Sequence, residues 1–221
     1  MKKIILLASL YLLTILVGLG QTSSGTLLLG AGFNFEGQQY QAAPSNTYSD
    51  TPYLTSSKIG GYSATMQAGK FIRDNLVVGL AGNHSATEFK ISYSRDGSLY
   101  YDHTHTLDFS VGPFIRKYIM VTDKFFFFSQ GSTGLSFGNT VEKPDPGSGN
   151  SSYKTKSLGA FAKLSPGVTY LITPKIGLDL TASGLSYDYI KYSESDINAH
   201  HVDLGLDLAS LNYGLRFYFA R

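Results

Sequence analysis

The chain has 221 residues, a formal net charge of +2 and no cysteine. Only 15% of its residues are charged, against roughly 25% in ordinary soluble domains, and it contains 24 Gly, 16 Tyr and 14 Phe. The lack of cysteine excludes a disulfide scaffold and a lipoprotein anchor, and the near-neutral balance argues against a nucleic-acid-binding protein.

Residues 1–20 have the order of a secretory signal peptide. Lys2 and Lys3 precede an apolar run over residues 4–17, and Gly18 and Gly20 are the small residues expected before a cleavage point. An uncleaved transmembrane helix is the weaker alternative, because the apolar run is shorter than the ~20 residues that a spanning helix needs. We expect cleavage after Gly20, which leaves residues 21–221 as one mature domain with 16 basic and 16 acidic residues.

The mature chain alternates between apolar and polar residues with a period of two, which is typical of β-strands with one buried face. The first strand, for example, sets Leu27, Leu29 and Phe33 against Gly30 and Asn34. The pattern predicts eight strands, over residues 27–36, 58–72, 76–83, 107–116, 125–137, 158–170, 176–183 and 211–219.

The connections between these strands alternate in length. Short turns are expected around Asp74, Asp123 and Pro174, and long loops over 37–57, 86–104, 139–154 and 188–201. A soluble β-sandwich would also alternate along its strands, but short turns on one side and long loops on the other are typical of outer-membrane barrels. The prediction is an all-β, eight-stranded antiparallel up-and-down transmembrane β-barrel with both termini in the periplasm.

Three local irregularities are expected. Pro113 and Pro166 fall within strands and are interpreted as bulge positions, and a phase slip in the last strand predicts a further bulge near Ala209-Ser210. The 139–154 loop, rich in Pro, Gly and Ser, is expected to be the most mobile part of the mature chain.

Several stretches resemble the small outer-membrane β-barrel proteins of the porin-like/opacity-protein superfamily. They are FIRDNLVVGLAG, SVGPFIRKYIMVTDKFFFF, AKLSPGVTYLITPKIGLDL and the closing YGLRFYF. The resemblance implies location in the outer membrane, contact with its lipids, and recognition of the aromatic last strand by the barrel-assembly machinery. The chain departs from the family by ending Phe219-Ala220-Arg221, where an aromatic residue is usual.

The histidines are the natural candidates for chemistry, but none predicts a site. His103 and His105 share a strand face, and His200 and His201 are adjacent, yet no cysteine or carboxylate cluster completes a metal-ligand set. His84 and Ser85 would point to opposite faces of a strand, so they cannot act as base and nucleophile without a bulge. We expect no catalytic residue, no metal and no cofactor.

Inward-facing polar residues predict a network inside the barrel. Its expected members are Asp108, Arg116, Lys163, Asp179, Asn212 and Arg216. Since eight strands leave an interior only wide enough for side chains, a packed polar interior is favoured over a solute pore. Asp179 and Arg216, on neighbouring strands in the periplasmic half, are expected to pair.

Three classes of function follow. A structural or surface-interaction role, in adhesion or envelope integrity, is favoured, with tyrosine-rich outer loops as a possible surface for an extracellular ligand. The alternative is a narrow channel or a transporter for small or hydrophobic solutes, which would need a continuous lumen or a lateral opening. A lipid-modifying enzyme would need a converging nucleophile and base.

Overall fold

A computed structural model of the chain describes residues 22–41, 53–95, 98–143, 151–193, 198–205 and 211–219. The expected signal peptide (1–20) and the expected bulge at Ala209-Ser210 lie outside these ranges. Within them, no helix is long and apolar enough to cross a membrane.

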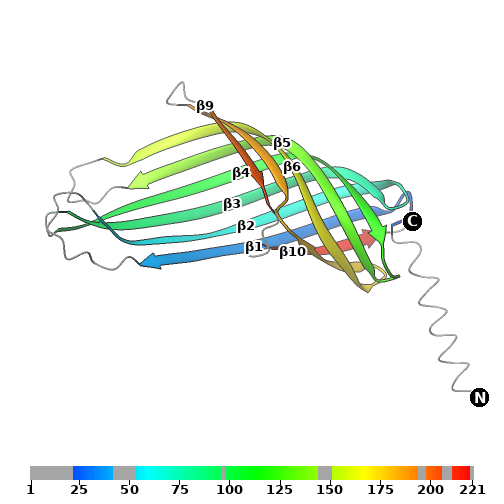
Figure 1. The fold of residues 1–221 in the computed structure, drawn as a ribbon. Helices are drawn as coiled ribbons and strands as arrows, with labels where there is room; N and C mark the ends of the chain where they lie inside the picture. Colours follow the sequence, from blue (N-terminus) through cyan, green and yellow to red (C-terminus); the bar gives the residue numbers. More distant parts are fainter. Residues whose placement is uncertain are drawn as a thin grey trace, which may run out of the picture.

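The described residues form an antiparallel β-barrel (Figure 1). Its strands are β1 (Leu27–Gln41), β2 (Tyr53–Arg73), β3 (Leu76–Arg95), β4 (Ser98–Met120), β5 (Phe125–Lys143), β6 (Tyr153–Thr173), β7 (Ile176–Thr181), β8 (Leu185–Tyr192), β9 (Asn198–Leu204) and β10 (Asn212–Phe219).

Eight of these strands close into a ring. Each of β1 to β6 pairs with the strand that follows it, and β7 pairs with β10. The ring closes where β10 pairs with β1, with Leu27 opposite Phe219. The first and last described strands therefore meet at the end of the barrel that carries the tight turns after β2, β4 and β6. The eight-stranded, up-and-down antiparallel prediction is confirmed.

The predicted long loops are largely wrong, because the strands continue through them. β3 and β4 pair along their whole length to Arg95 and Ser98, so 86–104 is a β-hairpin. Residues 37–41, 53–57, 139–143 and 153–154 also belong to strands, as do most of 188–201. Beyond the apolar band the outward-facing residues are polar, as in His84, Glu88 and Lys90, whereas Phe89 and Ile91 lie on the inner face. The pattern of an apolar outer face is therefore lost while the backbone ladder goes on. The rest of the 139–154 segment, residues 144–150, lies outside the described ranges.

The seventh strand is interrupted where it passes Pro166. β6 pairs with β7 from Gly167 onward and with β8 up to Leu164, and in between residues 182–184 face residues 165–166. Pro166 accepts a hydrogen bond at its carbonyl oxygen from Ala182 N–H (3.0 Å), so its missing N–H falls on this same edge. The bulge expected at Pro166 therefore lies in the strand opposite it.

The bulge expected at Pro113 is wrong. Val111 lies opposite Leu135 and Phe114 opposite Ser132, so the register between β4 and β5 is the same on both sides of the proline. Pro113 also keeps its place opposite Leu80 on β3. The ladder tolerates the missing donor here without an extra residue.

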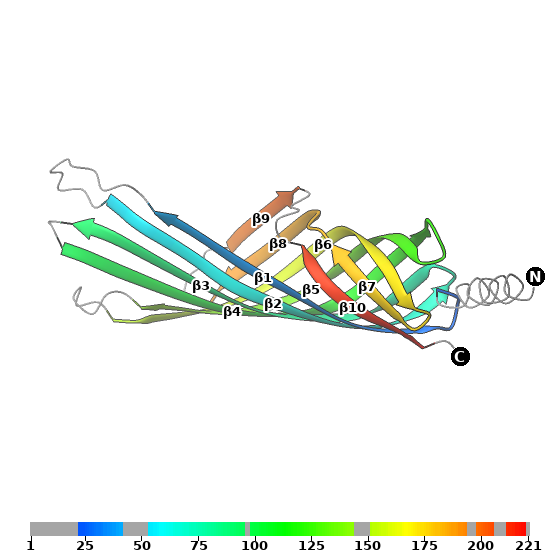
Figure 2. The ribbon, with the colours of Figure 1, turned by 90° about the horizontal axis from the view of Figure 1, so that it is seen from below.

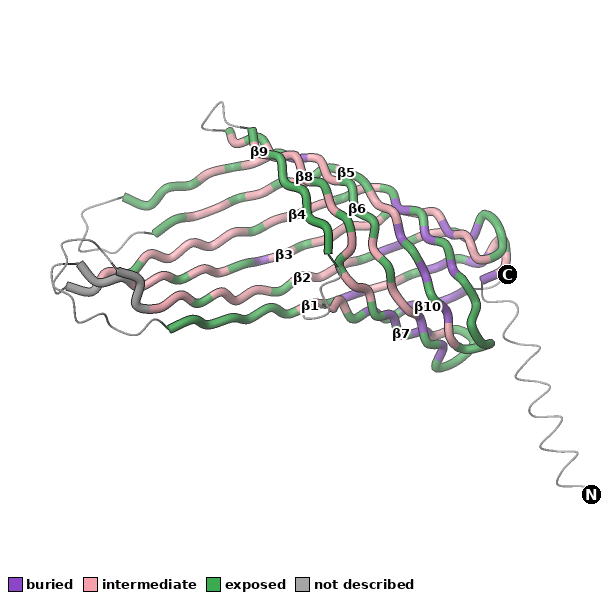
Figure 3. Tube along the Cα trace, in the orientation of Figure 1, coloured by how far each residue is buried: buried purple, intermediate pink, exposed green. Residues whose placement is uncertain are grey.

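The two faces of the wall differ as the alternation predicts. Outward-facing side chains form a band of exposed apolar and aromatic residues, including Phe33, Met66, Leu80, Phe109, Ile115, Leu135, Leu164, Leu178 and Phe217. Buried residues gather inside the end of the barrel that carries the termini (Figure 3). An apolar exterior around a closed ring is the surface that lipid requires.

Strand pairing closes the ring along only part of the seam between β1 and the last strands. β10 pairs with β1 from Leu27 to Phe33, and among the described residues the rest of β1, from Asn34 to Gln41, pairs with β2 alone. On the other side of the seam, β9 pairs only with β8 in the described chain. Figure 2 shows β1 and β2 running on past the end of β10, with the β8–β9 hairpin apart from them.

Candidate functional site: a polar plug in the barrel lumen

A layer of buried polar side chains crosses the half of the lumen that carries the tight turns, which is the half expected to face the periplasm. It is built by one inward-facing residue from each of six strands: Gln67 (β2), Arg116 (β4), Gln130 (β5), Thr169 (β6), Asp179 (β7) and Arg216 (β10). Alternation aims each of these side chains inward, because its two neighbours along the strand face lipid. We call these six residues the polar plug.

Asp179 is the centre of the polar plug. One of its carboxylate oxygens, Oδ2, accepts hydrogen bonds from Arg116 Nη1 (2.6 Å) and Arg216 Nε (2.7 Å). The other, Oδ1, accepts one from the Thr169 hydroxyl (2.6 Å). All three charged residues are at most 4% exposed. Charges this deeply buried persist only when they are paired and hydrogen-bonded, so the plug holds together as a unit.

Arg116 joins the layer across the barrel. Its Nε donates to Gln130 Oε1 (2.8 Å) and its Nη2 to Gln67 Oε1 (3.2 Å). The guanidinium carbon also lies 4.0 Å from the centre of the Phe128 ring, close enough for a cation–π contact. One arginine thus links strands β2, β4, β5 and β7.

An aromatic layer closes the lumen between the polar plug and the periplasmic turns. Its buried residues are Leu28, Phe71, Val77, Phe114, Tyr118, Phe126, Phe128, Leu171 and Tyr218. The Phe71 and Tyr118 rings stack 5.7 Å apart, and the Tyr118 hydroxyl accepts a hydrogen bond from Arg116 Nη1 (3.1 Å). The inward face at this end is therefore aromatic, although the alternation indicated a polar one. The run of four phenylalanines from Phe125 to Phe128, apolar on both faces, was the signal for it.

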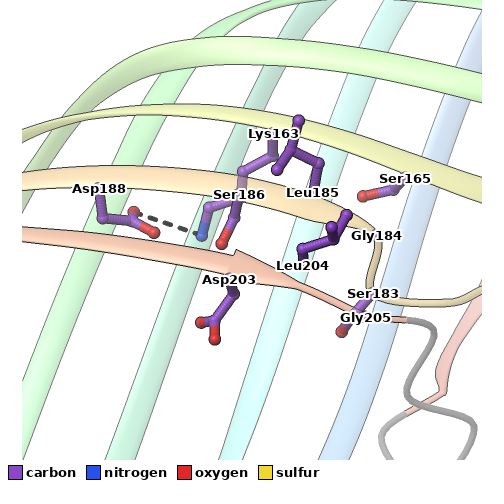
Figure 4. Close-up of a pocket in the computed structure, with 10 residues that line it drawn as sticks. All are labelled: Lys163, Ser165, Ser183, Gly184, Leu185, Ser186, Asp188, Asp203, Leu204 and Gly205. Carbon is purple, nitrogen blue, oxygen red and sulfur yellow. Dashed lines mark ion pairs between the residues drawn. The ribbon is translucent and has the colours of Figure 1, made fainter.

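The structure divides the six residues predicted to form one network. Asp179, Arg116 and Arg216 come together, while Asp108, Lys163 and Asn212 have no hydrogen bond to them among the described residues. Lys163 lies farther out and forms an ion pair with Asp188 (3.6 Å; Figure 4). Gln67, Gln130 and Thr169 complete the layer and were not among the six predicted residues.

Lys163 also lines a cavity of about 450 Å³ beside the break in the seventh strand. Ser183 and Gly184 of the break line it, together with Ser186, Asp188 and Asp203 from β8 and β9 (Figure 4). Its lining is mixed, with Leu185 and Leu204 beside the serines and carboxylates. No residue of the polar plug or of the aromatic layer lines it.

The described histidines do not form a common site with one another. His84 faces outward opposite Phe109, and Ser85 faces inward opposite Asp108, so this pair cannot act together. His103 contacts Glu88 on the exterior (2.6 Å), and His201 contacts Asp203 (2.7 Å). In the described part of the chain, no group of three or more His, Asp or Glu is arranged to hold a metal ion.

Comparisons with known proteins give similarity at the level of architecture. No protein-family model matches the sequence, and no curated protein matches it. Among solved structures, the chain is similar to the outer membrane protein OprG from Pseudomonas aeruginosa (14% identity, 92% of this chain and 100% of that chain covered, TM-score 0.42). It is also similar to Neisserial surface protein A (18% identity, 89% of this chain and 98% of that chain covered, TM-score 0.42). A third similar structure is that of Ail, the attachment invasion locus protein of Yersinia pestis (15% identity, 89% of this chain and 100% of that chain covered, TM-score 0.38).

The features of the chain itself identify its class. A closed antiparallel ring, an apolar exterior band and tight turns at one end with projecting hairpins at the other are the architecture of bacterial outer-membrane barrels. The chain is an outer-membrane β-barrel protein.

Proposed function

We propose that this protein is a non-conducting outer-membrane barrel with a structural or surface-interaction role and no catalytic activity. The observation that supports the proposal is the filled lumen: the polar plug and the aromatic layer occupy the periplasmic half across the full ring of strands. Porins that conduct solutes have roughly twice as many strands and a wide aqueous interior.

The proposal includes the route to the membrane. Residues 1–20 act as a cleaved signal peptide, and the aromatic last strand, with Tyr213, Phe217 and Phe219 facing outward, is read by the barrel-assembly machinery. The projecting ends of β2 to β6 expose Tyr101 and Tyr153 beyond the apolar band, where an extracellular ligand or surface would meet them.

Planar-bilayer recording of the purified barrel tests the central claim. We expect no steady single-channel steps, with a general porin inserted under the same conditions as the positive control. Regular conductance steps from the wild-type barrel would overturn the proposal. A second variant, with the β3–β4 hairpin shortened beyond Lys90 and His103, separates the structural role from the surface-interaction role. It should lose binding to an extracellular ligand or surface and still insert into the membrane.

A second function is supported by the partly open seam. A hydrophobic solute that enters the outer half of the lumen would leave sideways between β1 and β9, where the described strands do not pair. Gly205 lines the cavity at this place and has open space around it. Gly205→Trp should then reduce cellular uptake of a fluorescent apolar solute, whereas Gly82→Trp, on β3 and away from the seam, should not. Equal uptake in all three proteins would exclude lateral transport.

A further inference from the structure

Charged side chains in the outer half of the barrel are sorted by sign between its two faces. Alternation and register place ten basic or imidazole side chains on the exterior: Lys58, His84, Lys90, His103, His105, Lys143, Lys154, Lys156, Lys191 and His200. His84 and His200 lie against tyrosine rings of the outer face. We call the other eight the cationic belt. In the same region of the described chain, Glu88 is the one acidic side chain that faces outward.

The interior of the same half has the opposite character. Its inward-facing charges are the acids Glu36, Asp102, Asp108, Glu142, Asp188 and Asp203, with Lys163 and His201 as the basic side chains among the described residues. A strand surface that is charged only for solubility would mix both signs on each face. The sorting therefore indicates that the exterior faces an anionic environment.

Four members of the belt stand in one row across adjacent strands. Lys58 lies directly opposite Lys90, Lys90 opposite His103, and His103 opposite Lys143. Cβ atoms in such pairs are about 4.5–5.5 Å apart, so Lys58 and Lys90 place two like charges directly opposite each other, which destabilises a sheet in water. Glu88 contacts Lys90 (3.0 Å) and His103 (2.6 Å) and offsets the middle of the row.

The ends of the row lack such compensation. Lys58 and Lys143 have no carboxylate within ion-pair distance among the described residues, and the same holds for Lys154, Lys156 and Lys191. All five side chains are exposed. An anion supplied from outside the chain would relieve the repulsion between them.

The height of the belt identifies the source of that anion. Lys58 lies four residues beyond the outward-facing Tyr62, and Lys156 lies two beyond the outward-facing Leu158. At about 3.3 Å per residue along a tilted strand, the belt sits roughly 5–10 Å above the apolar band. This is the depth of lipid head groups, because the polar interface adds about 5–8 Å to each side of the hydrocarbon core.

We propose that the cationic belt binds phosphate groups of glycolipid head groups in the outer leaflet, and so forms an annulus of specifically bound lipid around the barrel. This rests on the proposed location of the barrel in the outer membrane and goes beyond its proposed role. Lysines near an anionic membrane surface act as point-charge phosphate ligands, and several together bind strongly.

Titration of the full-length barrel in zwitterionic detergent with lipid A that carries two phosphates tests the proposal, with bound lipid counted by native mass spectrometry. The test variant combines Lys58→Gln, Lys143→Gln, Lys154→Gln and Lys156→Gln. The matched control combines Lys70→Gln, Lys117→Gln, Lys124→Gln and Lys175→Gln, which removes the same charge at the periplasmic end. A third variant changes the four belt lysines to arginine.

The belt variant should bind lipid A at least about tenfold more weakly than wild type, while the control and the arginine variant bind it normally. Removal of the phosphates from lipid A should weaken binding to wild type to the same degree, and millimolar inorganic phosphate should not displace the lipid. Equal binding by wild type and the belt variant, equal loss in the control, or displacement by free phosphate would each overturn the proposal. Heat-dependent gel mobility shows that every variant is folded, and bilayer recording tests the non-conducting role separately.

Discussion

At the scale of single residues, the lumen is organised around one carboxylate. Asp179 faces two arginines, so the polar plug carries a net charge of +1 in a place that is almost closed to water. Each arginine is stabilised there mainly by the same oxygen atom. Loss of Asp179 would leave two buried cations that repel each other, which is a larger defect than the loss of either arginine.

We therefore expect Asp179→Ala to destabilise the barrel by about 3–5 kcal/mol, measured by urea unfolding in lipid vesicles. Arg216→Ala, which leaves Arg116 paired with Asp179, should cost less. The double variant should cost clearly less than the sum of the two single variants, because the interaction is removed only once. Asp123→Ala, in an exposed turn, is the charge-matched control and should change stability by less than about 0.5 kcal/mol. Simple additivity of the two single costs would show that Asp179 and Arg216 do not interact.

At the scale of elements, the seventh strand is divided into β7 and β8 by local chemistry. Pro166 removes a donor from the edge that faces the seventh strand, and the ladder resumes only at Leu185. Gly184 is required at the point where the strand rejoins, because a Cβ there would overlap the carbonyl oxygen of Leu164. The break frees the β8–β9 hairpin from β7 and β10, and so leaves the upper part of β1 with a partner on one side only.

Amide hydrogen exchange of the barrel in detergent micelles should reveal this edge. From Leu27 to Phe33, both sets of alternating β1 amides are hydrogen-bonded, to β2 and to β10, and should exchange slowly. From Asn34 to Gln41, every second amide points to the open seam and should exchange much faster than its neighbours. Uniformly slow exchange over 34–41 would mean that the seam closes in the membrane-like environment, and the lateral route would lose its support.

At the scale of the whole molecule, the two ends of the barrel differ in every respect. The end with the tight turns contains the start of β1, the end of β10, the aromatic layer and the polar plug, whereas the other end carries long hairpins with a charged outer face. We therefore expect the short turns to lie in the periplasm and the hairpins outside the cell.

The absence of cysteine from the whole chain makes this orientation easy to measure. In intact cells, a membrane-impermeant maleimide should label the single-cysteine variant Lys154→Cys at the outer end. It should label Asp123→Cys and Lys175→Cys, in the periplasmic turns, only after the cells are lysed. Labelling of the turn variants in intact cells would invert the topology, and the cysteine-free wild type gives the background.

The amino-acid sequence by itself determined the strand count, the face of the wall that the residues of each predicted strand take, and the pairing of Asp179 with Arg216. These depend on a local rule: neighbouring residues of a strand point to opposite faces, so alternation specifies the lipid face and the lumen face wherever one of them is apolar.

Only the tertiary structure decided how far the strands extend, which polar residues lie at the same level of the lumen, and where strand pairing closes the ring. Strand length beyond the apolar band depends on backbone pairing, which a stretch without an apolar outer face, such as Thr87 to Lys90, does not reveal. The level of a residue in the lumen depends on the stagger between strands. This stagger brings Gln67 and Asp179, which are 49 and 63 residues away from Arg116 in the sequence, into contact with Arg116. It leaves Asp108 and Lys163 farther out. The row of Lys58, Lys90, His103 and Lys143 has the same origin, because the register of three strand pairs aligns charges that lie far apart in the chain.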